Sequence, residues 1–348
     1  MSIWIKRFLI LTFILACAAF ASAFYVLNQA NKQMHYVANQ DVYLLHVERG
    51  DNALGLFNDL NETFELGANP LLFKVWLRLN SEKAVIKKGV YEIPKSSRLV
   101  DVFERVSSGN TKQFSITLIE GQTIKQWYQQ IKRLDSLQQD LPNIQALYDT
   151  LIGAEGQQNT AFCENKHASI EGCLLPDTYY YSYKDSALSI LHRAFRAMSI
   201  YIEDSWQQRF QDLPIPSMYE ALILASIVEK ETGLASERDL IAGVFVNRLL
   251  QNMRLQTDPT VIYGIGDEFD GNITRKHLRA MTPYNTYRIK GLPITPIAMS
   301  SRDSIMAALR PASTEYLYFV SKGDGSHQFS ETLDEHNAAV RRYQLNKK

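Results

Sequence analysis

The chain has 348 residues, 46% of them apolar, and its 37 basic side chains balance its 37 acidic ones. This length allows two domains, or one large domain with an appendage, and the composition is that of a folded globular protein. Because the net charge is zero, the sequence lacks the basic excess that accompanies nucleic-acid binding, and we expect no nucleic-acid partner.

A membrane-spanning helix is predicted near the N-terminus. Residues 8–27 contain no charged side chain, and an apolar helix of about 20 residues is long enough to cross a bilayer. Lys6 and Arg7 precede this segment, so the positive-inside rule leaves the N-terminus in the cytoplasm and the body of the protein exported. We assign residues 1–30 to a cytoplasmic tip and a single-pass anchor, and we expect a polar linker over residues 28–40.

Two other interpretations of the apolar segment stay open. Ala-Ser-Ala at residues 21–23 fits a signal-peptidase site. The stretch that ends at Cys17 loosely resembles a lipoprotein box, but the apolar run continues to residue 27 and would leave an apolar mature N-terminus. The anchor is favoured because the uncharged run has the length of a membrane span.

The remaining cysteines, Cys163 and Cys173, lie ten positions apart in the part of the chain expected to be exported. In an oxidising compartment such a pair forms a disulfide or remains as two unpaired thiols in a loop. Spacing alone leaves this open, because it does not fix the distance between the Cα atoms.

The first soluble segment, residues 41–112, shows the pattern strand, helix, helix, strand. Residues 42–51 form a predicted strand that ends in a glycine turn, and residues 86–94 form a second strand that ends at a proline. Between them lie two helical patterns, the second with Asn69 as its cap and Pro70 at its first position. This order resembles a LysM module, a small peptidoglycan-binding fold.

The second soluble segment begins with another strand, glycine turn and helix, over residues 114–131. We assign residues 113–345 to a larger domain, although this first unit fits either soluble part. Both soluble parts are expected to contain helices and strands, and we predict an α+β protein that consists of the N-terminal transmembrane helix, the small module of residues 41–112 and the larger domain.

A strongly apolar helix is predicted from residue 218 onwards. Ser217 and Glu220 form a capping box, and residues 221–228 are apolar except for one serine. A helix that is apolar on every face is buried all round. The two acids that follow it, Glu229 and Glu231, therefore lie where the chain emerges from a hydrophobic core.

The two glutamates lie about 200° apart around the helix axis, since each residue turns the helix by about 100°. They therefore face different surroundings. The negative end of the helix dipole raises the pKa of a carboxyl, and a general acid needs a raised pKa to hold its proton. Glu231 lies nearer that end, which favours it slightly. The alternative is a pair of solvated surface acids.

The segment 254–266 has the sequence RLQTDPTVIYGIG. Its amide, hydroxyl and carboxylate groups suit a hydroxyl-rich ligand. The alternative is an ordinary Asp-Pro turn.

With these residues the chain resembles the YceG-like family of endolytic murein transglycosylases. The resemblance rests on several stretches: ASIVEKET, ASERD, GVFVNRL, MRLQTDPTVIYG, LLPDTYYY, YNTYRIKGLPITPIA and YLYFVSKGDGSHQFSETLDEHN. Two departures occur. Met299-Ser300-Ser301 stands where the family usually has Asn-Pro-Gly, and Cys173 stands where an aromatic residue is common.

The resemblance implies internal cleavage of peptidoglycan between N-acetylmuramic acid and N-acetylglucosamine, with formation of 1,6-anhydromuramic ends. It places the essential acid on Glu231. It also implies a single-pass protein of the bacterial inner membrane with its catalytic domain in the periplasm, which acts in cell-wall synthesis and remodelling alongside the complexes that synthesise the wall.

One carboxyl group suffices for such a reaction, because the muramyl C6 hydroxyl can attack its own anomeric carbon in place of water. The residues expected to hold the sugar are Glu229, Gln256, Thr257, Asp258, Tyr263, Asn285 and Tyr287. His327 follows a predicted turn between two strands, and it either reaches the cleft or is a half-buried surface residue.

Two alternative functions stay open, a hydrolysing muramidase that uses Asp258 as a second carboxylate and a non-enzymatic peptidoglycan-binding scaffold. No cofactor or metal is expected, because the sequence contains no H-E-x-x-H motif, no G-x-S-x-G motif and no Walker loop.

Overall fold

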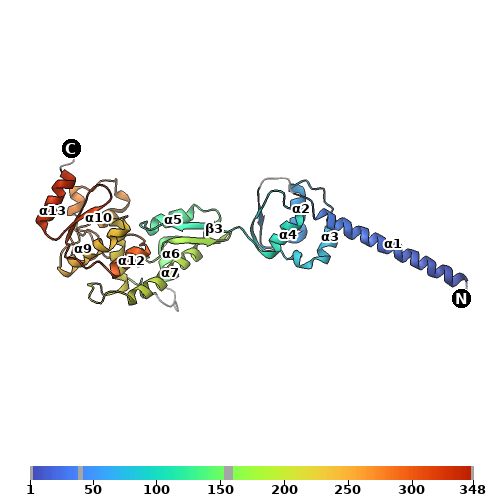
Figure 1. Cartoon of the computed structure of the whole chain (residues 1–348), viewed down its shortest axis with the longest axis horizontal. Helices are drawn as coiled ribbons and strands as arrows, with labels where there is room; N and C mark the ends of the chain where they lie inside the picture. Colours follow the sequence, from blue (N-terminus) through green and yellow to red (C-terminus); the bar gives the residue numbers. More distant parts are fainter. Residues whose placement is uncertain (1–2, 38–41, 153–159, 346–348) are drawn as a thin grey trace. The chain divides into compact units, whose positions relative to one another are not determined.

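The computed structural model describes residues 3–37, 42–152 and 160–345 (Figure 1). The chain divides into two compact units. The smaller unit holds Met1–Phe114 and Tyr180–Tyr183, and the larger holds Ser115–Tyr179 and Lys184–Lys348.

A single continuous helix, α1 (Ile3–Gln33), begins the chain (Figure 1). Its 31 residues correspond to about 46 Å at 1.5 Å per residue. Its most apolar window has a mean hydropathy of 2.3 and no buried residue, so the helix has the length and composition of a membrane span or a signal sequence.

The expected linker begins later than predicted, because α1 continues through Gln33. The amide of Gln33 donates to the Asn69 carbonyl at 3.2 Å and accepts from the Asn69 N–H at 3.0 Å, and Ala30 and Met34 are buried. Contacts with the folded unit therefore hold the last helical turns. Residues 38–40 of the predicted linker, and residue 41, lie outside the described residues.

After α1 the smaller unit has the predicted order of strand, helix, helix and strand. Its elements are β1 (Tyr43–Val47), α2 (Ala53–Thr63), α3 (Pro70–Leu79), the 3₁₀ helix η1 (Ser81–Ala84), β2 (Gly89–Ile93) and α4 (Leu99–Ser108). The two strands are antiparallel, with Tyr43 opposite Ile93 and Val47 opposite Gly89. Asn69 caps α3 as predicted, since its side chain accepts from the Leu71 N–H.

Aromatic rings form the centre of this unit. Phe57 of α2 and Phe73 of α3 stack with their ring centroids 4.1 Å apart, and Trp76 and Phe103 pack against Phe73. Three of the four rings are completely buried and Trp76 is 4% exposed. Rings of this size bury enough apolar area to stabilise a small unit that contains only two short strands.

The larger unit begins with short strands and helices, which are β3 (Phe114–Leu118), α5 (Ile124–Lys132), β4 (Leu137–Gln138), α6 (Ile144–Leu151), β5 (Asp177–Tyr181), β6 (Asp185–Ser186) and α7 (Ala187–Gln207). Strand β3 pairs with β5, and β4 pairs with β6 in parallel. Cys163 and Cys173 form a disulfide with their Cα atoms 5.8 Å apart, which decides between the two alternatives that the spacing left open.

The remaining elements of the larger unit include its most buried helix, α8. They are α8 (Met218–Glu231), η2 (Ala235–Glu237), α9 (Arg238–Leu250), α10 (Asp258–Ile265), η3 (Gly266–Glu268), α11 (Arg275–Arg279), α12 (Arg302–Leu309), β7 (Tyr318–Ser321), β8 (His327–Ser330), α13 (Leu333–Val340) and a π-helical turn, η4 (Arg341–Leu345). Strands β7 and β8 form the predicted antiparallel hairpin. The mixture of helices and strands agrees with the predicted fold class.

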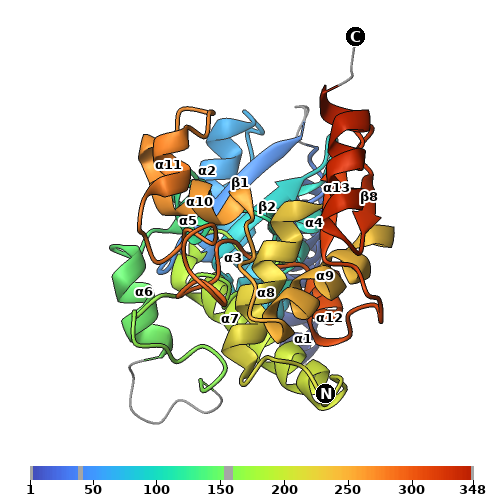
Figure 2. The same ribbon diagram turned by 90° about the vertical axis from the view of Figure 1, so that its left-hand side faces the viewer.

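Helix α8 is buried on every face, as its composition predicted. Ser217 caps its first turn by accepting from the Glu220 N–H, and residues 221–228 are each at most 3% exposed. Helices α7, α9, α10 and α12 pack around it (Figure 2). The core of the larger unit therefore fixes where the end of α8 lies.

Candidate functional site

Helix α8 ends at Glu231, because Thr232 has an extended backbone, with φ −144° and ψ 137°. Gly233 is not left-handed, so α8 does not end in a left-handed glycine cap. The carboxyl of Glu231 therefore lies at the negative end of a buried helix dipole.

Glu229 and Glu231 point to different surroundings, as their angular separation predicted. Glu229 accepts hydrogen bonds from both the N–H and the hydroxyl of Ser301, the N-cap residue of α12. Glu229 thus joins α8 to α12 and does not line the cavity that contains Glu231. This position argues against the predicted role of Glu229 in holding the sugar.

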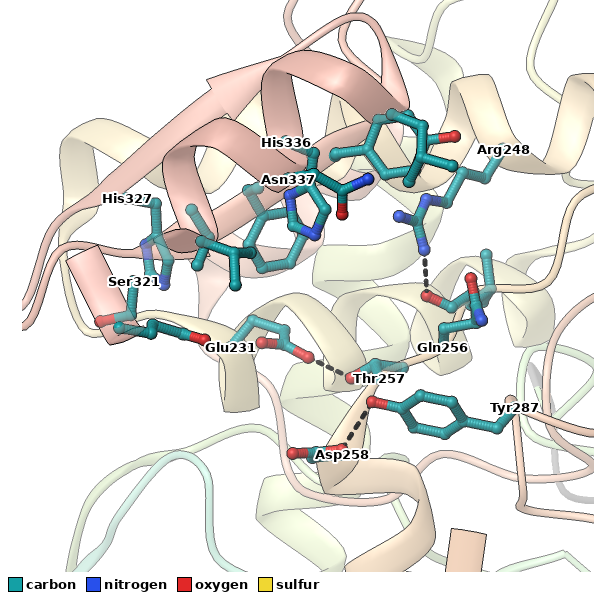
Figure 3. A pocket seen from close by; sticks show the side chains of 17 residues that line it. Glu231, Arg248, Gln256, Thr257, Asp258, Tyr287, Ser321, His327, His336 and Asn337 are labelled. Carbon is teal, nitrogen blue, oxygen red and sulfur yellow. Dashed lines mark hydrogen bonds between the residues drawn. The ribbon is translucent and has the colours of Figure 1, made fainter. Parts of the chain in front are cut away.

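Glu231 lines a cavity of about 560 Å³. Five of the residues predicted to hold a ligand line the same cavity (Figure 3): Gln256, Thr257, Asp258, Tyr287 and His327. They come from the loop before α10 and the first residue of that helix, from the segment after α11 and from β8, so three separate stretches of sequence converge on one carboxyl group.

The loop before α10 presents Thr257 to Glu231. Thr257 is the N-cap residue of α10 but makes no side-chain cap, because its hydroxyl donates to Glu231 Oε1 instead. The Thr257 N–H donates to the Thr286 hydroxyl at 3.0 Å. Gln256 has a left-handed φ of 50°, a strained conformation for a residue other than glycine, and its N–H donates to the Thr286 carbonyl.

The environment raises the pKa of the Glu231 carboxyl. Burial makes the largest contribution, and the negative charge of Asp258 adds to it. The hydrogen bond from Thr257 and the charges of His327 and Arg248 act in the opposite direction. The net effect is a carboxyl that holds its proton to higher pH than an exposed glutamate, which is the property that a general acid needs.

Asp258 is held by Tyr287, whose hydroxyl donates to Asp258 Oδ1 at 2.7 Å (Figure 3). Asp258 is also the first residue of α10, where the positive end of the helix dipole favours a carboxylate.

His327 is fixed by a residue that the sequence analysis missed. Its Nδ1 lies 2.7 Å from Glu237 Oε2, and its backbone N–H donates to Glu237 Oε1 at 3.0 Å. The two side chains are only 11% and 12% exposed, and His327 lines the cavity, which agrees with the first of its two alternatives. Glu237 lies in the short turn between α8 and α9, where an acid in a charged stretch gave no sign of burial.

The sequence analysis also missed Arg248, His336 and Asn337, which line the cavity. Arg248 is only 7% exposed although it lies in the last turn of α9, and an arginine that follows the apolar stretch of residues 240–246 was the available signal. His336 and Asn337 belong to the EHN stretch at the end of the longest matching motif.

Two predicted ligand residues lie elsewhere. The Tyr263 hydroxyl donates at 3.2 Å to Glu171, and both line a second cavity, of about 810 Å³. Burial raises the pKa of Glu171 to about 8. Asn285 is 1% exposed, and its side chain binds the carbonyls of residues 277, 278 and 280 and the Tyr287 N–H. Asn285 therefore supports the backbone next to Tyr287.

Among residues 3–37, 42–152 and 160–345, no group of three or more histidine, cysteine, aspartate or glutamate side chains is arranged to hold a metal ion.

One partly buried carboxyl with a raised pKa, surrounded by polar groups in a cavity, is typical of an enzyme that uses a single acid for proton transfer. The chain belongs to the YceG-like family, whose model matches residues 45–342.

Relatives and a solved structure agree with this family. An endolytic murein transglycosylase of Bacillus subtilis is 34% identical over 73% of this chain and 72% of its own length. One of Streptococcus pneumoniae is 26% identical over 73% of this chain, which spans 50% of that protein. The crystal structure of a yceG-like protein from Listeria monocytogenes matches 86% of this chain and 98% of its own, with 28% identity and a TM-score of 0.53.

Proposed function

We propose that the protein is an endolytic murein transglycosylase, which cleaves the bond between N-acetylmuramic acid and N-acetylglucosamine within peptidoglycan strands and leaves 1,6-anhydromuramic ends. The observation that carries this proposal is the environment of Glu231, a carboxyl with a raised pKa in a polar cavity. The relatives that bear this name in two other bacteria support the same activity.

In the proposed reaction Glu231 acts twice. As an acid it donates its proton to the glycosidic oxygen while the bond from that oxygen to the muramyl C1 breaks. As a carboxylate it then accepts the proton of the muramyl C6 hydroxyl, whose oxygen forms the new bond to C1. The proton count balances without water, and the intramolecular attack has the advantage of a high effective concentration.

Neighbouring groups assist both steps. The Thr257 hydroxyl stabilises the carboxylate that forms after the first proton transfer, because it already donates to Glu231. Asp258 and Tyr287, joined by their hydrogen bond, and His327, held by Glu237, line the cavity as rigid polar groups that position sugar hydroxyl and acetamido groups. Gln256 supplies a further amide on the same side as Thr257.

The proposed layout follows the chain. Residues 1–30 anchor the protein in the bacterial inner membrane, and Lys6 and Arg7 keep the tip in the cytoplasm, which puts the rest in the periplasm. Residues 41–112 form a LysM-like module that binds the glycan strand, an assignment supported by the strand, helix, helix, strand order and the antiparallel pairing of β1 and β2. Residues 113–345 form the catalytic domain. An inner-membrane anchor places this domain where wall-synthesis complexes work.

Mass analysis of fragments released from purified sacculi tests the activity. The wild-type protein should release fragments with anhydromuramic ends, which are one water lighter than hydrolysis products. Glu231→Gln should abolish release, because an amide cannot donate the proton. Glu229→Gln is the matched control and should stay active, since its side chain binds Ser301 outside the cavity.

Two results would overturn the proposal. Products that carry the mass of an added water would indicate a muramidase, with Asp258 as the obvious second carboxylate. A folded Glu231→Gln protein with full activity would remove the assignment of the acid.

A further inference from the structure

One side of the catalytic cavity has no role in the mechanism above. Arg248 of α9, Tyr318 of β7 and His336 and Asn337 of α13 line it. Figure 3 shows Arg248, His336 and Asn337 along one side, with Glu231, Thr257 and Asp258 along the other. A ligand that reaches Glu231 therefore also meets these residues.

Arg248 is a buried cation, and one nitrogen of its guanidinium, Nη2, makes no hydrogen bond to the part of the protein that the structure describes. Its Nε donates to the Leu317 carbonyl at 2.6 Å, and its Nη1 donates to the carbonyls of Leu255 at 2.7 Å and Arg254 at 3.4 Å. Within the described residues its Nη2 donates to no acceptor, and no acidic side chain lies within ion-pair distance of the guanidinium. Burying a cation without an opposite charge is costly, so this position favours an acceptor group on a bound ligand.

His336 supplies a second unused group beside Arg248. Its Nδ1 is buried and has no hydrogen-bond partner in the part of the chain that the structure describes. The ring stacks on Tyr318 with centroids 5.2 Å apart, and the Arg248 guanidinium lies 5.2 Å from the same Tyr318 ring. Burial and the charge of Arg248 lower the pKa of His336, so the neutral ring keeps one N–H to donate.

We propose that Arg248 and His336 form a subsite for the D-lactyl group of muramic acid, the substituent that distinguishes it from N-acetylglucosamine. The lactyl carbonyl oxygen, in an amide or a free carboxylate, accepts from Arg248 Nη2 and from the His336 ring. Arginine suits this role because its planar fork keeps a fixed geometry while other donors hold the backbone.

This subsite rests on the proposed function and deepens it. The two sugars of a glycan strand alternate and differ only at the lactyl position, so a pocket for that group selects which of the two bonds reaches Glu231. Leaving a buried donor unpaired is costly, and a strand shifted by one sugar would do so here. The subsite would therefore fix the register of cleavage.

The test measures binding by the full chain in detergent micelles in a Glu231→Gln background, so that no ligand is cut. Titration calorimetry compares an oligomer of N-acetylglucosamine with alternating oligomers of equal length, either peptide-bearing or denuded. The parent should bind both alternating oligomers at least tenfold more tightly. His336→Phe, which keeps the stacking ring, and Arg248→Lys should each reduce that preference by roughly tenfold, as expected for loss of a hydrogen bond to a charged or buried group.

The binding of the N-acetylglucosamine oligomer should change less than twofold in both variants. His336→Phe tests the subsite even if Arg248→Lys fails to fold, because this variant keeps the hydrogen bonds from Arg248 to its three backbone carbonyls. An equal loss for all ligands, an unchanged preference, or a loss confined to the peptide-bearing oligomer would overturn the lactyl subsite. A parent that binds none of the oligomers would overturn the proposed function as well, whereas a parent that binds all equally would overturn the subsite alone.

Discussion

Replacing Thr257 with valine tests how the hydrogen bond from Thr257 affects the pKa of Glu231. The change removes the hydroxyl that donates to Glu231 but keeps the shape of a side chain that is 3% exposed. A hydrogen bond to a charged group contributes about 1.5–3 kcal/mol, and one pKa unit corresponds to about 1.36 kcal/mol. We therefore expect the pKa of Glu231 to rise by about 1–2 units.

The basic limb of the pH profile of kcat/KM should move to higher pH, because the acid form of Glu231 persists further. The plateau rate should fall, since an acid with a higher pKa gives up its proton less readily. Thr257→Ser is the control, because it keeps the donor. Release of soluble fragments from sacculi between pH 5 and pH 9 provides the assay. A basic limb that stays in place or moves to lower pH in Thr257→Val would refute the reasoning.

The same change makes a prediction about stability. The folded pKa of Glu231 lies above its ordinary value of 4.5, so folding favours the protonated form. The contribution of protonated Glu231 to the free energy of unfolding is fully present below the unfolded pKa and is lost as pH rises through the folded pKa. Thr257→Val should therefore unfold at a temperature close to that of the wild type at pH 4, and at a clearly lower temperature above the folded pKa. A difference in unfolding temperature that does not grow with pH would contradict this account.

Other changes should act in different directions. Asp258→Asn removes a charge that raises the pKa of Glu231, so the basic limb should move to lower pH, and a shift to higher pH would contradict the assigned sign. Removing the Cys163–Cys173 disulfide, which closes a loop of ten positions, should cost about 2–3 kcal/mol by the loop-entropy argument, measured by denaturant unfolding with and without reductant. Ser301→Ala removes the N-cap of α12 and should cost about 1 kcal/mol while cleavage stays within twofold of the wild type, and a large loss of activity would show that this cap belongs to the site.

The position of Glu231 at the end of a buried helix could be predicted from sequence because it depends on local rules. An apolar run from residue 221 to residue 228, a capping residue at Ser217 and the helical repeat together place Glu229 and Glu231 on different sides of a buried helix. In the structure residues 221–228 are buried, and Glu229 binds Ser301 away from the cavity that contains Glu231. The end of α1 could not be predicted in this way, since hydropathy marks where a membrane span stops and not where a helix stops.

The neighbours of Glu231 were harder to predict, because a polar motif does not show which side of its helix each residue occupies. Asp258 and Tyr263 lie five positions apart on α10, which corresponds to about 140° around the axis, and they line different cavities. The pairing of Glu237 with His327 joins residues 90 positions apart. Such contacts depend on the tertiary packing of α9 against the β7–β8 hairpin, which no local pattern encodes.

Helix α8 has no exposed stretch between its cap and its final turn, and this has a consequence for how the enzyme can diversify. Inserting or deleting one residue would swing the terminal carboxyl by about 100° and would force a complete repacking of four neighbouring helices. We therefore expect natural variants to change which glycosidic bond is cleaved through the loop before α10 and through the β7–β8 hairpin. Helix α8, which ends at Glu231, should keep its length.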